Sequence, residues 1–192
     1  TVAVLDQAFR PVFNAPVRDV ALDPKSRILA VGDFEVVNKV ERNLIARLWQ
    51  NGRLDTTFVP QLARREMSWD QLSSVALQPD GKVLVAGRFR LLGRAERLGL
   101  ARLNSDGSVD NKFEPSAAGH GLGLSEVALQ ADGRILAAST LIGSNVITVG
   151  DLFRLNADGS RDSTFKWGWL RADGAETMQV LPNGAIMLGR AG

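Results

Sequence analysis

The sequence predicts an all-β fold made of β-propeller blades, and three observations lead to this prediction. Two short motifs recur in a fixed order along the chain. The recurrence has a period of about 52 residues. Each motif consists of two β-favouring runs around a turn signal, which is the pattern of a hairpin. Antiparallel units of four short strands at this period are typical of propeller blades.

The first motif is an apolar run, a turn signal and a second apolar run. Its four copies, the last one eroded, span Val20–Gly32, Val75–Gly87, Val127–Ser139 and Met178–Gly189. Asp and Gly tolerate the positive φ of tight hairpins, so we expect inner hairpin turns at Asp80-Gly81 and Asp132-Gly133. The first copy departs from the pattern and has Lys25-Ser26 at its turn.

The second motif follows each of the first three copies and ends in Asp-X-X-Phe. It spans Ala46–Phe58, Ala101–Phe113 and Phe153–Phe165, and its tail occurs alone as Leu5–Phe9. The terminal phenylalanines, starting from Phe9, lie 49, 55 and 52 residues apart, so the variation falls in the connecting loops. We expect outer hairpin turns at Asp106-Gly107 and Asp158-Gly159.

Two hairpins per repeat give four strands of about five residues each. The repeats are then 10–58, 59–113 and 114–165, with partial repeats at 1–9 and 166–192, in one propeller domain that spans 1–192. A parallel β-helix would need shorter rungs, and a β-sandwich would not repeat its sequence at this period. Helix should be scarce, and Gln61–Gln71 is the best candidate for a helical turn.

The repeats do not add up to a finished ring. Beside the three complete repeats there are an orphan strand at Val2–Phe9 and an orphan hairpin at Thr177–Gly189, which makes about fifteen strands for the incomplete propeller. An open arc would expose two apolar blade faces and unpaired strand edges. We therefore expect the chain to belong to a longer polypeptide, or its open ends to be covered by another copy or another subunit.

Composition excludes several classes of site. The chain has 192 residues, 45% of them hydrophobic, and no Cys, so it has neither disulfides nor thiolate metal ligands. Its apolar runs are far shorter than the roughly 20 residues of a membrane-spanning helix. The net charge is only +2, which does not produce a strong field. No targeting signal is visible, so we expect that one was removed or that the chain is a fragment.

The two motifs in order, at their clearest between Val75 and Phe113, resemble the delta-60 β-propeller repeat of bacterial proteins. The resemblance spans nearly the whole chain. It implies a repeat module of large, mostly exported proteins, often without an assigned enzymatic role, and hence an extracellular or cell-surface location. The departures in the first and last copies argue against the same ligand binding at every blade.

The outer turns also have a superficial likeness to a calcium loop. Oxygen-bearing side chains alternate along Asn104–Asp110 and Asn156–Asp162. The Gly stands in the wrong place for an EF-hand, and the first repeat has Trp49 where a ligand would be needed. Turn chemistry favours the hairpin interpretation over a calcium site, and the sequence leaves both open.

Three side chains recur in every complete repeat and are interpreted as structural. An Arg before the outer turn and an Asp after it lie across one hairpin, as in Arg102 and Asp110 or Arg154 and Asp162. A functional Arg would usually be unique to one blade, whereas a guanidinium that bridges strands is needed in all of them. The terminal Phe is expected to pack between neighbouring sheets.

A denser group of cations stands out in the second repeat, and large aromatic residues lie in loops. The candidate interaction patch consists of Arg88, Arg90, Arg94, Arg97, Trp69, Trp167 and Trp169. The tryptophans suit stacking on sugars, but covering of a blade edge is the favoured interpretation. The variable segments where contacts are expected are Asn38–Asn43, Pro60–Ser73, Leu91–Leu98 and Ala117–Leu124.

No catalytic, cofactor-binding or metal-binding residues are predicted. The single histidine, His120, cannot form a zinc site or a triad by itself. The leading hypothesis is a non-enzymatic propeller that serves as a binding or assembly scaffold for a protein partner in a larger exported or surface protein. The alternative is a carbohydrate-active or anionic-polysaccharide-binding propeller; nucleic-acid binding is not expected, because the Arg cluster lacks interleaved aromatics apart from Phe89.

Overall fold

A computed structural model describes residues 9–60, 70–89, 91–92, 95–97, 99–115, 123–139, 151–166 and 177–189. All regular structure in these ranges is β, and no helix among them is long and apolar enough to cross a membrane. The helical turn expected at Gln61–Gln71 falls almost entirely outside the described residues. Its last residue, Gln71, begins a strand.

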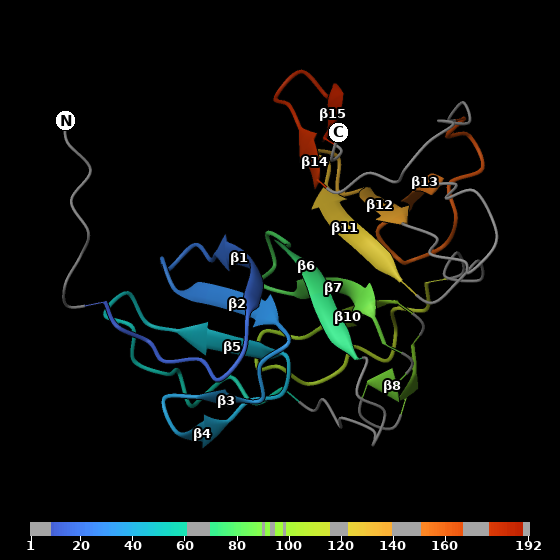
Figure 1. Cartoon of the computed structure of the whole chain (residues 1–192). Coiled ribbons are helices and arrows are strands. Elements are labelled where there is room, and N and C mark those ends of the chain that lie inside the picture. The colour runs from blue at the N-terminus through green and yellow to red at the C-terminus, as the bar shows by residue number, and fades with distance from the viewer. Residues whose placement is uncertain are drawn as a thin grey trace, which may run out of the picture.

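Three sheets of three strands and one two-stranded sheet follow one another along the chain, and Figure 1 shows them succeeding each other from the left of the view to its top. Every hydrogen-bonded pair of strands is antiparallel. The sheets consist of β1 (Val17–Leu22), β2 (Ile28–Gly32) and β5 (Ile45–Leu48); β6 (Gln71–Leu77), β7 (Val83–Arg88) and β10 (Leu100–Leu103); β11 (Leu124–Leu129), β12 (Ile135–Ser139) and β13 (Asp151–Leu155); and β14 (Thr177–Val180) and β15 (Ile186–Gly189).

The all-β repeat fold is confirmed, but the fourth strand of each repeat is reduced to a single bridge. Leu54, Val109 and Arg161 pair with the last residues of β5, β10 and β13, respectively. The strand stops because the next residue is the Asp of Asp-X-X-Phe, whose carboxylate accepts a hydrogen bond from the amide two positions on, as Asp55 does from Thr57 N at 3.0 Å. The chain therefore turns before a longer fourth strand can form.

The hairpin turns lie where the sequence predicts them. Gly81, Gly107, Gly133 and Gly159 all have positive φ, which turns of this kind require. In the first copy of the first motif, which lacks Asp-Gly at its turn, Ser26 takes the same conformation with a φ of 58°.

Two short hairpins were not predicted. β3 (Val36–Val37) pairs with β4 (Val40–Glu41), and β8 (Leu91–Leu92) pairs with β9 (Ala95–Glu96). Each is inserted between the second and third strands of its repeat, and we call them the connecting hairpins. Asn38 and Lys39 both have positive φ, as a two-residue turn demands. These hairpins could not be predicted from the sequence, because strands of two residues carry almost no periodic signal.

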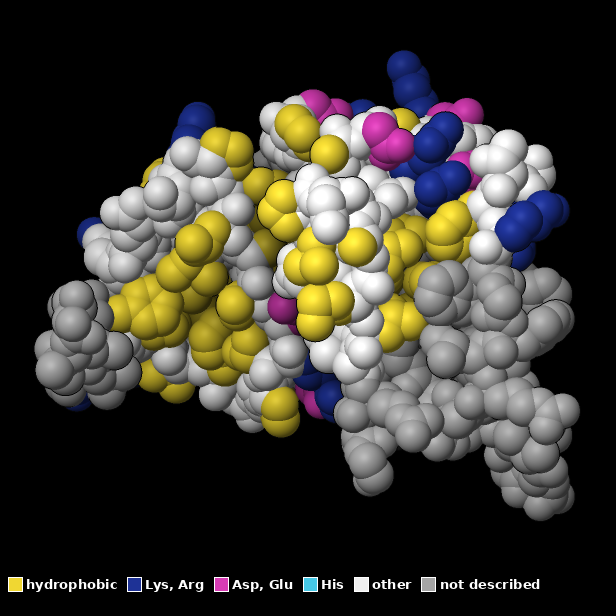
Figure 2. Space-filling view, turned by 90° about the horizontal axis from the view of Figure 1, so that it is seen from above, with side chains coloured by type: hydrophobic (Ala, Val, Ile, Leu, Met, Phe, Trp, Pro, Cys, Tyr) yellow, Lys and Arg dark blue, Asp and Glu magenta, His cyan; other side chains and the backbone are white. Residues whose placement is uncertain are grey.

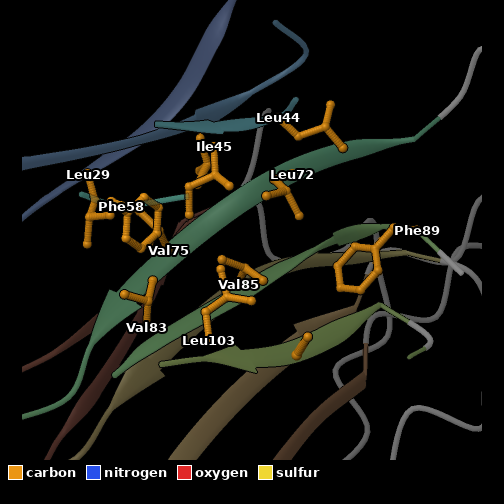
Figure 3. Close-up of a cluster of buried hydrophobic side chains, with 12 residues drawn as sticks. Leu29, Leu44, Ile45, Phe58, Leu72, Val75, Val83, Val85, Phe89 and Leu103 are labelled. Carbon is orange, nitrogen blue, oxygen red and sulfur yellow. The ribbon is translucent and has the colours of Figure 1, made fainter. Parts of the chain in front are cut away.

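The core lies between successive repeats. In the largest cluster, side chains of the first repeat such as Leu29, Ile45 and Phe58 meet side chains of the second repeat such as Val75 and Val85, as Figure 3 shows. The same arrangement joins the second repeat to the third and the third to the fourth. Each sheet is thus covered by the next one, as in a propeller.

The orphan strand expected at Val2–Phe9 falls outside the described residues except for Phe9. The segment that follows packs on the first repeat, where Phe9, Phe13 and Ala15 contact a cluster that includes Phe34. Phe13 also bridges to Val37. The described sheets do not close into a ring, since the last sheet does not cover the face of β1, where Val20 and Leu22 remain exposed.

Candidate functional site

The recurring Arg and Asp residues form one ion-pair cluster in each complete repeat. Nε of the Arg lies 2.8 Å from the carboxylate in Arg47–Asp55, 2.9 Å in Arg102–Asp110 and 2.8 Å in Arg154–Asp162. The predicted pairing across the outer hairpin is therefore confirmed.

A second cation, which the sequence analysis missed, reaches the same carboxylate from the inner hairpin. Nη1 of Arg27 lies 3.1 Å from Asp55, Nζ of Lys82 lies 2.9 Å from Asp110, and Arg134 lies 3.6 Å from Asp162. The signal was present in the sequence, because a cation occupies the position after the inner turn in each complete repeat.

The guanidinium also covers the terminal phenylalanine. Cζ of the arginine lies 4.7 Å from the ring centroid in Arg47–Phe58, 4.4 Å in Arg102–Phe113 and 4.7 Å in Arg154–Phe165. Phe58 and Phe113 are fully buried, in agreement with their predicted place between sheets. This stacking explains why Arg is used at the position, since a planar guanidinium can bind a carboxylate with its edge and an aromatic ring with its face.

The same arginines reach into the next repeat. Nη1 of Arg47 donates to the carbonyl oxygen of Ser105 at 2.7 Å, and Nη1 of Arg102 donates to that of Ala157 at 2.7 Å. Both acceptors lie in the outer turn of the following repeat. The clusters of Arg47 and Arg102 therefore tie three strands of their own repeat to the neighbouring one.

The electrostatics of these clusters favour ionised carboxylates. Burial works against the charge of Asp55, but hydrogen bonds from Thr57 and Arg47 outweigh it and hold the pKa of Asp55 below its ordinary value. The pKa of Asp110 is lowered in the same way by Lys82 and Arg102. Hydrogen bonds from Thr164 and then Arg154 lower the pKa of Asp162 to about 2. The clusters are built as fixed ion pairs.

The outer turns use their side-chain oxygens internally. Oδ1 of Asp106 accepts from the amide and the hydroxyl of Ser108 at 2.9 and 2.7 Å, and Nδ2 of Asn104 donates to the same hydroxyl. Asp158 and Ser160 repeat the pattern. These contacts are those of a hairpin turn, and nowhere in the described ranges do three or more His, Asp or Glu side chains converge as metal ligands.

The candidate interaction patch is placed only in part. Arg88 ends β7 and is exposed, and Arg97 follows β9 and is partly buried, so these two arginines flank the connecting hairpin β8–β9. The other patch residues lie outside the described residues, as does His120: they are Arg90, Arg94, Trp69, Trp167 and Trp169.

The connecting hairpins lie at the end of the sheets opposite both hairpin turns. This follows from the antiparallel order, because the loop between the second and third strands leaves at the other end from the turns on either side of it. The hairpin β3–β4 is held in place by Asn14, whose Oδ1 accepts from the amides of Glu35 and Val36, both at 2.9 Å. This hairpin therefore has a fixed position, and it carries exposed side chains such as those of Lys39 and Glu41.

The three connecting segments differ in charge. Residues 33–43 carry three acidic and two basic side chains, residues 88–98 carry four arginines and one glutamate, and residues 140–150 carry no charged side chain. The turn end repeats the same Arg–Asp ion pair in the three complete repeats, whereas the segments between the second and third strands differ in charge from one repeat to the next. Variable loops that a rigid scaffold positions often carry the binding residues of a protein.

A polar ladder on the first strands of the repeats was missed by the sequence analysis. Asp19, Ser74 and Glu126 stand directly before the Val of each first motif, at an irregularity in the strand register. Oδ2 of Asp19 accepts from Val75 N at 2.8 Å, and Oγ of Ser74 accepts from Val127 N at 3.2 Å. The ladder therefore links the inner edges of successive repeats.

Glu126 has the most perturbed carboxyl group of this ladder. It accepts a hydrogen bond from Oγ of Ser74 at 2.8 Å. Burial raises its pKa to about 7, Ser74 opposes the rise, and the negative charge of Asp19 adds to it. The signal for this site was a polar residue directly before the Val of the first motif, at the same position in each complete repeat.

Comparison with known proteins bears on the three complete repeats. A family model described as a domain of unknown function (DUF5122) β-propeller matches residues 26–58, 78–113 and 130–165, which make up more than half of the chain. Each match runs from an inner turn to the terminal phenylalanine of a repeat. No curated protein matches the sequence.

Proposed function

The chain belongs to the DUF5122 β-propeller family, and from this premise we propose that it is a non-enzymatic binding and assembly module of a larger exported or surface protein of bacteria. The observation that carries the proposal is the contrast between the two ends of the sheets. One end repeats a single ion-pair cluster, and the other presents connecting segments of different charge.

The uniform end supports a structural role for the charged residues found there. Asp55, Asp110 and Asp162 are each held by two cations, and the Arg of each pair is stacked on a phenylalanine. A carboxylate kept ionised by fixed partners is poorly suited to exchange protons with a substrate near neutral pH. These groups therefore stabilise the scaffold and leave recognition to the other end.

The variable end supports binding. In the second repeat the connecting segment brings four arginines within eleven positions, 88–98, with Arg88 and Arg97 on either side of β8–β9. Such a segment suits an acidic surface on a protein partner. The same arginines favour the alternative function, binding or cleavage of an anionic polysaccharide. The delta-60 repeat type and an extracellular or cell-surface location are part of the proposal, and both rest on the resemblance of the motifs.

The proposal is tested with a variant in which Arg88, Arg90, Arg94 and Arg97 are replaced by Ser. The matched control replaces four exposed cations outside the connecting hairpins, Lys25, Arg53, Lys112 and Lys166, by Ser. Each set of substitutions is introduced into the native protein, and the two variants and the parent are analysed by crosslinking and mass spectrometry. We expect the parent and the control to show contacts between residues 88–98 and a protein partner. The variant without the four arginines should lose these contacts.

Alginate, polygalacturonate and heparin serve as probes for the alternative. Binding of one of them without formation of new chain ends would make a polysaccharide the ligand of the scaffold. Cleavage that is lost on replacing one carboxylate would overturn the non-enzymatic proposal. Equal loss of partner contacts in the two four-residue variants would remove the assignment of recognition to the connecting hairpin.

A further inference from the structure

The first sheet has an exposed apolar face at a position that is buried in every later sheet. Val20 and Leu22 on β1 are 59% and 68% exposed. The residues equivalent to Val20 are Val75, Val127 and Met178, and they are only 6%, 3% and 6% exposed. Figure 2 shows hydrophobic side chains open to solvent over the N-terminal repeat at the left of the view.

The cover of this face in the later sheets comes from the second strand of the preceding repeat. Leu29 packs in the cluster of Val75, Leu84 in the cluster of Val127, and Leu136 in the cluster of Met178. The position of these leucines in the last repeat is occupied by Met187, which pairs with Gln179 as Leu84 pairs with Ala76. Met187 is 59% exposed. The molecule therefore presents both halves of its own internal interface.

The two halves also correspond in the strands that form them. On the first repeat, the outer part of the face is already covered by Phe9, Phe13 and Ala15, which pack with Ala30 and other residues of β2 and β5. The open part lies on β1, the first strand of the sheet. What the last repeat offers is a hairpin of first and second strands, β14–β15, which is the part of a repeat that covers this area elsewhere.

We propose that β14–β15 of one molecule docks on β1 of a second copy of this chain, with Met187 covering Val20 and Leu22 as Leu29 covers Val75 within the chain. This proposal deepens the proposed assembly function and rests on it. The contact is heterologous, since two different faces meet, and it leaves one free face of each kind on every dimer. Copies therefore add head to tail, into a ring if the rotation closes.

The polar ladder supports the same geometry. Within the chain, the side chain before the Val of one repeat accepts a hydrogen bond from the amide of that Val in the next, as Asp19 does from Val75 N and Ser74 from Val127 N. Thr177 holds this position in the last repeat. Its hydroxyl is the acceptor for Val20 N of the second copy, an amide that within one chain binds Oδ1 of the adjacent Asp19.

The test uses the full chain and two single substitutions, one for each face. Leu22→Lys blocks the first face and Met187→Lys blocks the last, while Val59→Lys, at a side chain 55% exposed and on neither face, is the matched control. Analytical ultracentrifugation should show concentration-dependent association of the parent and the control. Each face variant alone should associate at least about tenfold more weakly, since a charge at an apolar contact costs more than about 1.4 kcal/mol.

Mixing the two face variants gives the decisive result. Leu22→Lys retains Met187, and Met187→Lys retains Leu22, so the mixture should form a one-to-one dimer that stops at two chains. A parent that stays monomeric, a mixture that does not combine, or a single face variant that associates like the parent would each overturn the proposal. Equal thermal unfolding temperatures of the variants and the parent would exclude loss of folding as the cause of weaker association. If self-association is absent but residues 88–98 still contact a protein partner, the self-association proposal fails and the proposed binding function stands.

Discussion

Arg102 and Ala157 are 55 positions apart, and they are joined by a hydrogen bond of 2.7 Å from Nη1 of the guanidinium to the carbonyl oxygen. Through Nε the same guanidinium holds Asp110, and its face covers Phe113. One side chain thus links the third strand of a repeat, its own tail and the outer turn of the next repeat. This relationship makes the arginine a joint between blades.

Arg102→Ala should therefore destabilise the protein by about 1–3 kcal/mol, the cost of leaving buried charged hydrogen-bonding groups without their partner. Arg154→Ala is the matched comparison. Among the described residues, Arg154 bonds only within its own repeat, so its removal should cost less. Urea unfolding monitored by circular dichroism measures both differences, and coincident curves for Arg102→Ala and the parent would contradict the structural role.

Gly107→Ala and Gly133→Ala separate two reasons for glycine in the hairpin turns. Both glycines have positive φ, 94° and 84°, so either substitution should cost about 1 kcal/mol in backbone strain. A Cβ on Gly107 would also lie 2.8 Å from the backbone carbon of Val59, whereas a Cβ on Gly133 meets nothing within 4 Å. Gly107→Ala should therefore lower the stability by clearly more than Gly133→Ala in the same unfolding experiment, and equal losses would show that the contact with Val59 yields freely.

Much of the fold could be predicted from the sequence because the repeats give several independent readings of one unit. Asp80-Gly81 and Asp106-Gly107 fix the hairpins, and the apolar runs between them fix the strands. The connecting hairpins could not be predicted, since their strands have two residues each and differ between repeats. The shortening of the fourth strand was also hidden, because it depends on a side chain to main chain hydrogen bond of Asp55 that competes with the strand.

The charged clusters were predictable only in part for a related reason. Arg102 and Asp110 lie eight positions apart across one turn, and such a pairing can be inferred from a hairpin. The contacts of Lys82 with Asp110 and of Ser74 with Glu126 join residues 28 and 52 positions apart. Those partners are brought together by the second hairpin and by the stacking of repeats, neither of which leaves a local signal.

Acid should unfold the protein partly through the ion-pair clusters. The folded-state pKa values of Asp55, Asp110 and Asp162 lie below the ordinary value, and that of Asp162 falls to about 2. Since the unfolded state takes up these protons first, the stabilisation is present above about pH 4 and is lost as the pH falls towards 2. Asp110→Asn should lower the stability at pH 7 and flatten its dependence on pH between about 2 and 4. The free energy of unfolding is measured with urea at several pH values in that range. A dependence on pH as steep in the variant as in the parent would contradict the assignment.

Glu126→Gln should act in the opposite direction and in a different pH range. The pKa of Glu126 is raised to about 7 by burial, to which the charge of Asp19 adds. Between about pH 4.5 and 7 the unfolded chain has lost this proton while the folded chain retains it, so the stability of the parent falls as the pH rises through that range. Gln keeps a neutral side chain that can still accept from Ser74 Oγ, and it removes the repulsion from Asp19. We expect the variant to be more stable than the parent by about 1 kcal/mol at pH 8, a value discounted for the partial exposure of the group, and equal to it near pH 4.

The difference between the two proteins isolates this group, because His120 and every other titratable side chain are present in both. Urea unfolding at steps from pH 4 to pH 8 measures it, and a stability difference that stays constant with pH would show that folding does not raise the pKa of Glu126.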